Sequence, residues 1–429
     1  MTAGKNVSCA ARIAIVGAGI AGLSSALYLS RLGHAVTVFE RFPEAQPVGS
    51  GLMLQPTGMS VLHDLGLLDA VLQLGQPLFG LLGHDARSGR KILDVAYRGT
   101  RFGLGVNRAA LFQVLYDAVR AAGIPVETGH EISRTEMSGR EIALVDRQGN
   151  RVDAAFDLVV DAAGVRSPPR DRNDPSAIPR AFAYGAFWAT LRLPDTGFAF
   201  DRLEQRYERA SVMVGVMPAG RANPDAPRTC AFFWSVKTAD VPSVRDAGLS
   251  AWKSRVLDLW PATAPLLDQI KSFADLTAAE YWHLTLRRPY SGRLIHVGDS
   301  AHATSPQLGQ GANMALLDAR ALAHAMAAGG PVESVCGAYA RSRRLHVRFF
   351  QLASRALTPF YQSDSHLIPW LRDGLVATVA KIPPMPGLLS GLVSGTLVSP
   401  FGPIGLSEVE WAHVDSATAE PTPIVGLEA

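Results

Sequence analysis

The stretch from Gly17 to Gly22 constrains the fold of this chain more than any other, because it carries the spacing Gly-x-Gly-x-x-Gly. The apolar run from Arg12 to Val16 comes directly before it, and the residues from Ile20 to Leu32 continue with apolar side chains near helical period. This order predicts a buried strand, a tight turn and a helix.

The residue types of the turn suit a dinucleotide. Gly17 permits the turn, Gly19 lets the backbone approach a pyrophosphate, and Gly22 allows close packing of the helix on the strand. The free N–H groups at the start of the helix favour phosphate. A second apolar run, 35–39, ends in Glu40, which lies 21 residues beyond Gly19 and can accept hydrogen bonds from ribose hydroxyls. We therefore expect a dinucleotide to contact Gly17, Gly19, Ala21, Gly22 and Glu40.

Composition fits an enzyme of several domains and excludes other classes of protein. The 429 residues predict two or three domains, and an apolar content of 48% suffices for sizeable cores. A net charge of +3 is too small to indicate nucleic-acid binding. Cys9, Cys230 and Cys336 are odd in number and widely scattered, which predicts neither a disulfide framework nor a metal site and favours a reducing cytoplasm.

The sequence predicts neither a signal peptide nor an integral membrane segment. The first apolar run is already the nucleotide-binding strand. The charge-free stretch 382–407 contains five prolines and five glycines, which do not form a regular spanning helix. Residues 358–406 are rich in Leu, Pro and Gly, and three interpretations of them stay open: a lid, an interfacial patch with peripheral membrane contact, or a packing arm.

A second informative stretch begins at Gly298, with Asp299-Ser300-Ala301-His302 followed by Gly309-Gln310-Gly311-Ala312-Asn313. It resembles the second flavin motif of the class A, single-component FAD-dependent aromatic monooxygenases, the family typified by p-hydroxybenzoate hydroxylase. The resemblance runs in order over about residues 12 to 350. It implies one FAD held by both halves of the chain, NADPH or NADH as transient reductant, and molecular oxygen and a small molecule as co-substrates.

Several residues of this stretch are expected near the flavin. Asp299 follows a strand and can accept hydrogen bonds from the ribityl hydroxyls, while a helix beginning near Gly311 directs its positive end toward the ring and stabilises the reduced anion. His302 is expected to be structural, and no catalytic side chain is assigned. The expected ring-side residues are Pro306, Gly309, Gln310 and Gly311, and Ala312 and Asn313 complete the expected cofactor contacts.

Three further positions follow from the resemblance. Arg41 resembles an Arg that contacts the FAD phosphates, and Arg108 resembles the family Arg at the start of a helix that faces the ribityl-phosphate chain. Gly51, in the run from Gly49 to Leu52, resembles the loop that skirts the flavin ring. Independently of the family, Asn107 is predicted to cap a helix whose apolar face includes Leu111 and Leu115.

One position departs from the family pattern. Ala163 stands where the family has an Asp that the resemblance associates with FAD and NAD(P)H pyrophosphate contacts. Asp161 lies two residues earlier, and two residues along a strand return a side chain to the same face. Our hypothesis is that Asp161 supplies part of this polar function.

The expected fold class is α/β. A Rossmann-like FAD-binding domain is interleaved with a substrate domain built on a mostly antiparallel β-sheet, and a C-terminal helical segment follows. The expected boundaries are 1–75, 102–180 and 287–355 for the FAD-binding domain, 76–101 and 181–286 for the substrate domain, and 356–429 for the C-terminal arm and tail.

The chemistry implied by the resemblance is hydroxylation of an aromatic, quinolone or polyketide-like compound through a flavin C4a-hydroperoxide. The central sheet is expected to line the substrate pocket, and its candidates are Phe187, Trp188, Trp234 and Trp282. No carboxylate clamp is evident, which favours an apolar or polycyclic substrate. Two alternatives stay open: a same-fold FAD-dependent reductase or halogenase, and a flavin-binding protein without turnover.

Overall fold

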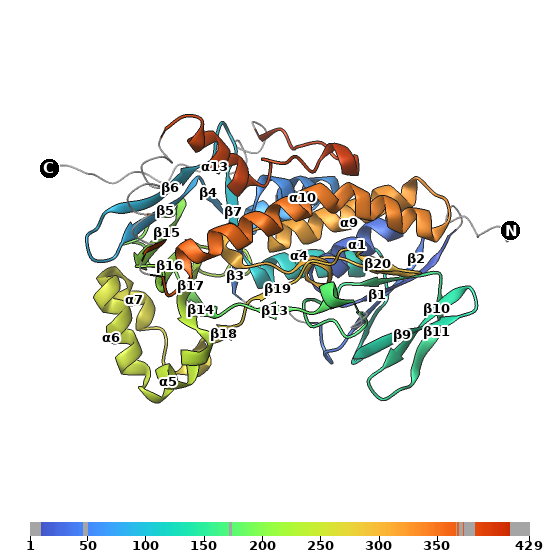
Figure 1. Ribbon diagram of the computed structural model, residues 1–429, viewed down its shortest axis with the longest axis horizontal. Helices are drawn as coiled ribbons and strands as arrows, with labels where there is room; N and C mark the ends of the chain where they lie inside the picture. Colours follow the sequence, from blue (N-terminus) through green and yellow to red (C-terminus); the bar gives the residue numbers. More distant parts are fainter. Residues whose placement is uncertain are drawn as a thin grey trace.

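The first apolar run forms strand β1 (Arg12–Val16) at the centre of a mostly parallel sheet in the computed structural model (Figure 1). The structure describes residues 10–45, 50–170, 174–365, 367–368, 372 and 382–411. Cys9 and Gly49 lie outside these ranges. The chain is an α/β protein whose mostly parallel and mostly antiparallel strands form separate sheets.

The parallel sheet places the two glycine-rich stretches at one edge. β1 pairs in parallel with β2 and β12, and β12 pairs in parallel with β21, so the segments that follow these strands all leave from the carboxyl edge. Dinucleotides bind at this edge in doubly wound folds. In order, its strands are β20 (Tyr290–Ser291), β21 (Leu294–His296), β12 (Leu158–Asp161), β1, β2 (Ala35–Glu40) and β8 (Val126–Thr128).

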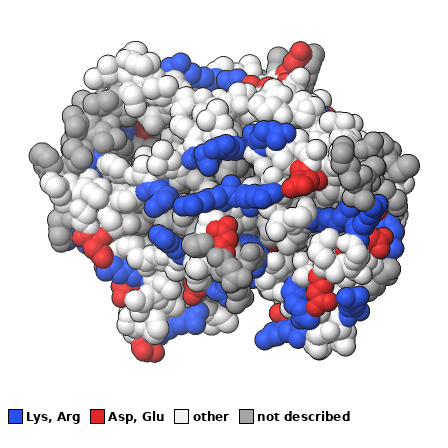
Figure 2. Space-filling view, turned by 45° about the vertical axis from the view of Figure 1, so that its right-hand side comes forward, with Lys and Arg blue, Asp and Glu red and all other residues white. Residues whose placement is uncertain are grey.

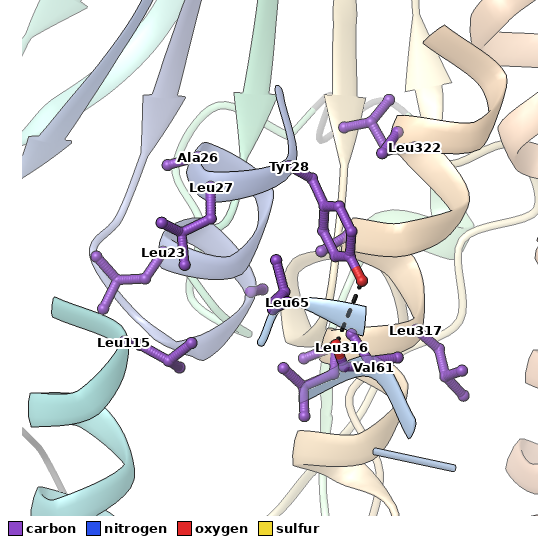
Figure 3. Packing of buried hydrophobic residues seen from close by; sticks show 14 of the residues in the cluster. Leu23, Ala26, Leu27, Tyr28, Val61, Leu65, Leu115, Leu316, Leu317 and Leu322 are labelled. Atoms are coloured by element: carbon purple, nitrogen blue, oxygen red, sulfur yellow. Dashed lines mark hydrogen bonds between the residues drawn. The ribbon is translucent and has the colours of Figure 1, made fainter. Parts of the chain in front are cut away.

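Helices from distant parts of the chain cover this sheet and form the largest core (Figure 3). Leu23, Leu115 and Leu316 are fully buried in it and come from three different helices. The hydroxyl of Tyr28 donates to the carboxylate of Asp64 at 2.7 Å, which ties two of these helices together. The helices are α1 (Ile20–Arg31), α2 (Pro56–Asp64), α3 (Leu68–Leu74), α4 (Arg108–Ala121) and α9 (Gly311–Ala327).

The second large sheet has seven strands and lies at the other end of the long axis (Figure 1). Every neighbouring pair in it is antiparallel except β15 and β5. In order, its strands are β18 (Thr277–Ala279), β14 (Tyr184–Arg192), β17 (Thr229–Lys237), β16 (Val212–Pro218), β15 (Arg202–Glu208), β5 (Gly80–Asp85) and β6 (Lys91–Ala96).

The two faces of this sheet have different neighbours. One face packs on α6 (Leu249–Leu259), α5 (Val241–Asp246) and α7 (Ala264–Leu267), with Trp252 at the centre of the contact. The other face packs on Met53 of β3 (Gly51–Leu54) and on Tyr361. We call the first the helix-covered face. We call the second the flavin-facing face, because Met53 lies 3.8 Å from the Cβ position of Gly309, which the resemblance places beside the flavin ring.

Three small sheets complete the strand inventory of the described ranges. The sheet of β3, β7 and β4 packs against the seven-stranded sheet, because Gly51 of β3 closely approaches Ala231 of β17 while Gly105 of β7 closely approaches Pro218 of β16. The remaining strands are β7 (Gly103–Asn107), β4 (Gln76–Leu78), β9 (Ile132–Ser138), β10 (Glu141–Asp146), β11 (Arg151–Phe156), β13 (Arg180–Ala181) and β19 (Trp282–His283).

The C-terminal part forms helices, as expected. α10 (Val332–Tyr361) runs along the long axis past both large sheets (Figure 1). α13 (Met385–Ser394) packs near β6, and Arg101 makes a two-pronged ion pair with Glu408, the shorter contact being 2.6 Å. Residues 382–411 therefore pack as an arm on the body of the protein.

Short helices complete the described elements: α8 (Asp299–His302), η1 (Pro175–Ala177), η2 (Thr238–Asp240), η3 (Pro261–Thr263), η4 (Phe273–Asp275), η5 (Pro306–Leu308) and η7 (Gly402–Ile404).

The domain boundaries stay a prediction, and the sheets can be compared with them. β5 and β6 join the strands of 181–286 in the seven-stranded sheet. β4, at residues 76–78, instead pairs with β7 in the small sheet, so the contribution of this segment to the seven-stranded sheet begins at Gly80.

Candidate cofactor site

The turn after β1 has no room for side chains at two of its glycines. Gly17 has a φ of +105°, and a Cβ there would lie 2.7 Å from the carbonyl oxygen of Ala162. A Cβ on Gly22 would overlap the carbonyl oxygen of Gly17. Gly19 differs, because nothing lies within 4 Å of its Cβ position in the described chain, and it is exposed at the start of α1. The turn therefore has an open side at Gly19, where a pyrophosphate can approach α1.

Glu40 secures the same turn from the end of β2. Its Oε2 accepts a hydrogen bond from the Ala18 N–H at 2.8 Å, and its Oε1 accepts one from the Phe42 N–H at 3.1 Å. Each carboxylate oxygen keeps a second acceptor direction. Arg41, the next residue, is exposed, with its guanidinium 4.6 Å from the ring of Phe42. Both side chains lie at the edge of the parallel sheet where the resemblance expects the adenosine end of FAD.

The two glycine-rich stretches meet directly. A Cβ on Gly298 would lie 3.1 Å from the Cβ of Ala21, although 277 residues separate these positions in the sequence. Gly298 has a φ of +62°, which favours glycine, and its N–H donates to Asp318 at 2.7 Å. The first turn of α1 and the segment after β21 thus form adjoining walls of one site.

Arg108 and Asp299 lie at the centre of these walls. Arg108 is the first residue of α4, which Asn107 caps by accepting a hydrogen bond from the Ala109 N–H at 2.9 Å. Solvent reaches both Arg108 and Asp299, yet dense surrounding protein raises the pKa of Asp299 by desolvation, against the opposing charges of His302 and Arg108. Desolvation likewise lowers the pKa of Arg108. Both side chains are exposed and their opposite charges interact, so this pair is placed to contact the polar middle of a dinucleotide.

The ring-side loop has the expected backbone. Gly309 adopts a left-handed conformation with a φ of +60°, and α9 begins at Gly311, where nothing lies within 4 Å of the Cβ position. Pro306 is exposed at the start of η5, and Ala312 is half-buried. Open space above the first turn of a 17-residue helix suits an anionic ring edge.

Two residues expected at the cofactor, Asn313 and Gln310, brace the loop with their side chains, and their contact with the cofactor stays a prediction. Asn313 accepts a hydrogen bond from the Gln55 N–H at 2.8 Å and donates to the carbonyls of Gly309 and Met53 at 2.8 and 3.2 Å. Gln310 donates to the carbonyl of Val393 at 2.8 Å. Both side chains are buried. They hold the loop in place through contacts with β3 and the C-terminal arm.

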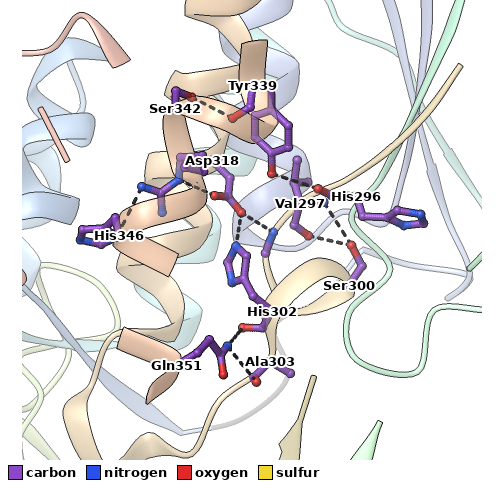
Figure 4. Close-up of polar contacts among 12 residues, drawn as sticks. His296, Val297, Ser300, His302, Ala303, Asp318, Tyr339, Ser342, His346 and Gln351 are labelled. Carbon is purple, nitrogen blue, oxygen red and sulfur yellow. Dashed lines mark hydrogen bonds and ion pairs between the residues drawn. The ribbon is translucent and has the colours of Figure 1, made fainter. Parts of the chain in front are cut away.

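His302 belongs to a buried ion network on the side of α8 that faces α10 (Figure 4). Its Nε2 lies 2.5 Å from Asp318, whose other oxygen accepts a hydrogen bond from Arg343 at 2.7 Å. Burial alone would raise the pKa of Asp318, but the nearby cations and their hydrogen bonds lower it to about 2. His346, which contacts the Gly395 carbonyl, has its pKa lowered to about 3 by desolvation and by Arg343. The position of His302 in this network agrees with a structural role.

The hypothesis for Asp161 is wrong. Its side chain is fully buried, and both oxygens have protein partners: Oδ1 accepts from the Ala163 N–H, while Oδ2 contacts Ser167 at 2.5 Å and His296 at 2.6 Å. β12 ends at Asp161, so the strand alternation that supported the hypothesis does not continue to Ala163. Asp161 joins β12 to β21 and does not face the cofactor site.

We expect Asp161→Asn to lower the free energy of unfolding by about 1 to 2 kcal/mol, because an amide has only one acceptor oxygen. Its nitrogen must face either the Ala163 N–H or the groups of Ser167 and His296 that contact Oδ2. FAD content is expected to stay unchanged. Urea denaturation followed by tryptophan fluorescence measures the first effect, and flavin absorbance of the purified variant measures the second. A normal stability with lost FAD would show that Asp161 acts on the cofactor after all.

The four aromatic pocket candidates divide between two faces. Phe187 and Trp234 belong to the core on the helix-covered face, where both contact Trp252, so they are core residues and not pocket residues. Trp188 lies on the flavin-facing side, 4.7 Å from Phe233, and donates to the Tyr281 hydroxyl at 2.7 Å. Trp282 is half-buried on β19 beneath Arg166.

Sequence reasoning missed a cluster that joins the ring-side loop to the flavin-facing face. The Tyr97 hydroxyl donates to Gln55 at 2.5 Å and lies 3.4 Å from the sulfur of Met53. A Cβ on Gly309 would lie 3.5 Å from Gln55 and 3.8 Å from Met53. Tyr97 and Gln55 stand at positions that look like core positions in the sequence. Since buried polar groups require partners, they could have indicated this cluster.

The observed residues fit FAD. The turn around Gly19 is open beside a helix N-terminus, the oppositely charged Arg108 and Asp299 are exposed, and Gly311 leaves the start of α9 uncovered. Within the described ranges, no group of three or more His, Cys, Asp or Glu side chains is arranged to hold a metal ion. None of the helices in those ranges combines the length and apolarity needed to span a bilayer.

Comparisons with known proteins agree with this geometry. The model of the family described as FAD binding domain matches residues 10–348. The chain is 30% identical to 3-amino-4-hydroxybenzoate 2-monooxygenase of Streptomyces cremeus, covering 76% of this chain and 81% of the relative. It is 25% identical to the aurachin C monooxygenase/isomerase of Stigmatella aurantiaca, covering 86% and 94%.

Solved structures share the fold. HpxO of Klebsiella pneumoniae, solved with FAD and uric acid, aligns with a TM-score of 0.73 at 22% identity over 90% of this chain and 97% of that chain. The 2-methyl-3-hydroxypyridine-5-carboxylic acid oxygenase aligns with a TM-score of 0.71 at 21% identity over 86% and 94%. The family match and the site together show that this chain belongs to the FAD-binding-domain family, among the class A FAD-dependent aromatic monooxygenases of the p-hydroxybenzoate hydroxylase type.

Proposed function

We propose that this monooxygenase uses NADPH or NADH and molecular oxygen to hydroxylate an apolar, hydroxyl-bearing aromatic or quinolone-like compound. The observation that carries the proposal is the contact of Met53 with both the ring-side loop and the flavin-facing face of the seven-stranded sheet. A compound held against this face lies next to the ring end of the cofactor site.

The lining of that face supports the choice of substrate class. Met213, Met217 and Phe233 belong to its buried cluster, and Trp188 packs against them. Gln205 is a buried polar neighbour, and its amide nitrogen lies 3.1 Å from the Met213 sulfur. Sulfur and aromatic side chains suit a flat apolar ring. Two similar proteins are named after hydroxylated aromatic compounds. They are 3-amino-4-hydroxybenzoate 2-monooxygenase and 2-methyl-3-hydroxypyridine-5-carboxylic acid oxygenase.

The chain contributes binding, orientation and exclusion of water. When bound, FAD supplies the redox chemistry with the nicotinamide and with dioxygen. The N-terminus of α9 at Gly311 stabilises negative charge at the ring end. Asn313 and Gln310 fix the loop, and the apolar flavin-facing face keeps water from the reacting atoms.

Two adjacent phenylalanines of β17 provide a matched test of the substrate face. Phe233 lies on the flavin-facing face, and Phe232 lies on the helix-covered face. We expect Phe233→Leu to raise the KM for the aromatic substrate roughly tenfold, because a ring contact is lost in the pocket. Phe232→Leu is expected to lower stability by about 1 to 2 kcal/mol with an unchanged KM. Equal effects of both variants on KM would contradict the assignment of faces.

The proposal is tested by oxygen incorporation. The purified FAD-loaded protein is incubated with NADPH or NADH, labelled dioxygen and a panel of phenols, hydroxybenzoates and quinolones. We expect nicotinamide oxidation to accelerate with one class of aromatic compound, and the product to carry one labelled oxygen atom. Saturation of a double bond without oxygen uptake would identify a same-fold reductase instead, an alternative that the Ala163 departure keeps open.

A further inference from the structure

A groove of about 290 Å³ lies between α10 and the segment 285–290. Ala301 and His302 of the flavin segment form part of its wall. Exposed arginines surround it, and Figure 2 shows Lys and Arg side chains gathered in a band across one face of the molecule. The exposed arginines that line the groove are Arg287, Arg288, Arg341, Arg344 and Arg348, and the buried Arg343 also lines it.

The positive charge of the groove is largely unneutralised. Arg341, Arg344 and Arg348 stand three and four residues apart on α10 and so project from one face of the helix. The sequence 334–361 contains no Asp or Glu. Among the lining residues that the structure describes, none is acidic. Arg288 alone of the five exposed arginines forms an ion pair, to Glu333 at 3.6 Å, while the buried Arg343 pairs with Asp318. Such a surface attracts an anion with several charges.

The side chains that line the groove indicate which kind of anion it binds. Guanidinium groups match phosphate oxygens in two-pronged pairs. The Arg341 guanidinium lies close to Gly337 and to Tyr290, because a Cβ on Gly337 would lie 3.1 Å from Arg341 Nη1 and 3.7 Å from the Tyr290 hydroxyl. The Arg288 guanidinium lies 4.4 Å from the Tyr290 ring centre and adds a flat, cationic surface. A phosphate-bearing nucleotide combines a flat base with charged groups and fits both features.

We propose that this groove binds the adenosine end of NADPH through its phosphates, with the 2′-phosphate held by Arg344 and Arg348. The inference rests on the proposed function, which requires a nicotinamide dinucleotide. It predicts that the protein prefers NADPH to NADH, because NADH lacks the 2′-phosphate. Ala301 and His302 of α8 line the groove, and α8 begins at Asp299 of the cofactor site. A nucleotide bound in the groove would therefore lie next to the flavin segment.

The first test measures binding without turnover. Adenosine 2′,5′-bisphosphate is titrated calorimetrically into the FAD-loaded wild type, into Arg344→Gln/Arg348→Gln, and into Arg355→Gln as a control. Arg355 is exposed on the same helix but does not line the groove. We expect the double variant to bind on the order of 30-fold more weakly and the control to bind as the wild type does. Equal binding by all three proteins would overturn the proposal.

The second test compares the two donors in turnover. The double variant is expected to raise the KM for NADPH about tenfold more than the KM for NADH, with kcat unchanged. Hydroxylation with unaltered donor preference would overturn the groove assignment while the proposed function stands. Retained binding of the bisphosphate without any hydroxylation would support the groove and contradict the proposed function. Arginine-dependent binding to phosphatidylglycerol vesicles, with no bisphosphate binding, would identify a lipid-facing surface and overturn the proposal.

Discussion

Replacement of Gly22 by valine is expected to produce a protein without bound FAD. The new side chain would overlap the carbonyl oxygen of Gly17, so the turn and α1 must separate. This movement misplaces the N–H groups of the turn, and we expect FAD affinity to fall on the order of 100-fold or more. Stability is expected to fall by about 1 to 3 kcal/mol, because the clash is with the protein itself.

Gly19→Ala separates the loss of cofactor from the loss of fold. No described atom lies within 4 Å of the new Cβ, so the FAD-free protein is expected to keep wild-type stability while FAD binds roughly tenfold more weakly. Gly402→Ala is the matched control, since its Cβ position is also open and it lies in η7. Fluorescence titration with FAD and thermal unfolding of the FAD-free proteins measure both quantities. Wild-type FAD affinity in Gly22→Val would contradict the assigned turn.

Asp318→Ala is expected to lower the free energy of unfolding by about 3 to 5 kcal/mol, because it leaves the buried guanidinium of Arg343 without its counter-charge. The Gly298 N–H and His302 lose their partner as well. The flavin segment loosens as a result, so FAD affinity is expected to fall together with stability. Urea denaturation and FAD titration check the two effects. Removal of one ion pair from the surface, as in Lys91→Ala, serves as the control, with an expected effect below about 1 kcal/mol.

The same carboxylate predicts a dependence on pH. The folded pKa of Asp318, about 2, lies below the ordinary value of 3.8. A lowered carboxyl pKa stabilises the fold above the unfolded value, and this contribution is lost as pH falls from about 4 to about 2. The difference corresponds to about 2 kcal/mol. The stability gap between wild type and Asp318→Asn is therefore expected to narrow over this range, and a constant gap would show that Asp318 does not titrate as described.

Local signals in the sequence were sufficient for the cofactor half of the fold. The β1, turn and α1 unit is confirmed because a glycine spacing, an apolar strand and a helical period all indicate the same local structure. The cap at Asn107 and the start of α9 at Gly311 are confirmed for the same reason. The contact between Ala21 and Gly298 was implied by the resemblance alone, since no local pattern links positions so far apart.

The substrate side could be predicted only in outline. β14 and β17 are apolar on both faces, so alternation does not reveal that Phe187 lies on the helix-covered face and Trp188 on the other. The role of Asp161 depends on His296, which another strand supplies 135 residues later. Asp318 is a carboxylate within an apolar helical segment, which indicates that it needs a partner. Its partner Arg343 comes from α10, and no sequence motif predicts how α10 packs. These assignments required the tertiary structure.

The most direct test of the account is a titration of FAD into the FAD-free protein, followed by flavin fluorescence, in the wild type and in Asp299→Ala. Asp299 belongs to the later half of the site, and Gly19 belongs to the first. We expect one FAD per chain in the wild type, and affinity at least tenfold weaker in Asp299→Ala with an unchanged stoichiometry. A protein that binds no FAD, or one whose affinity is unaffected by Asp299→Ala, would contradict a single cofactor held by both halves of the chain.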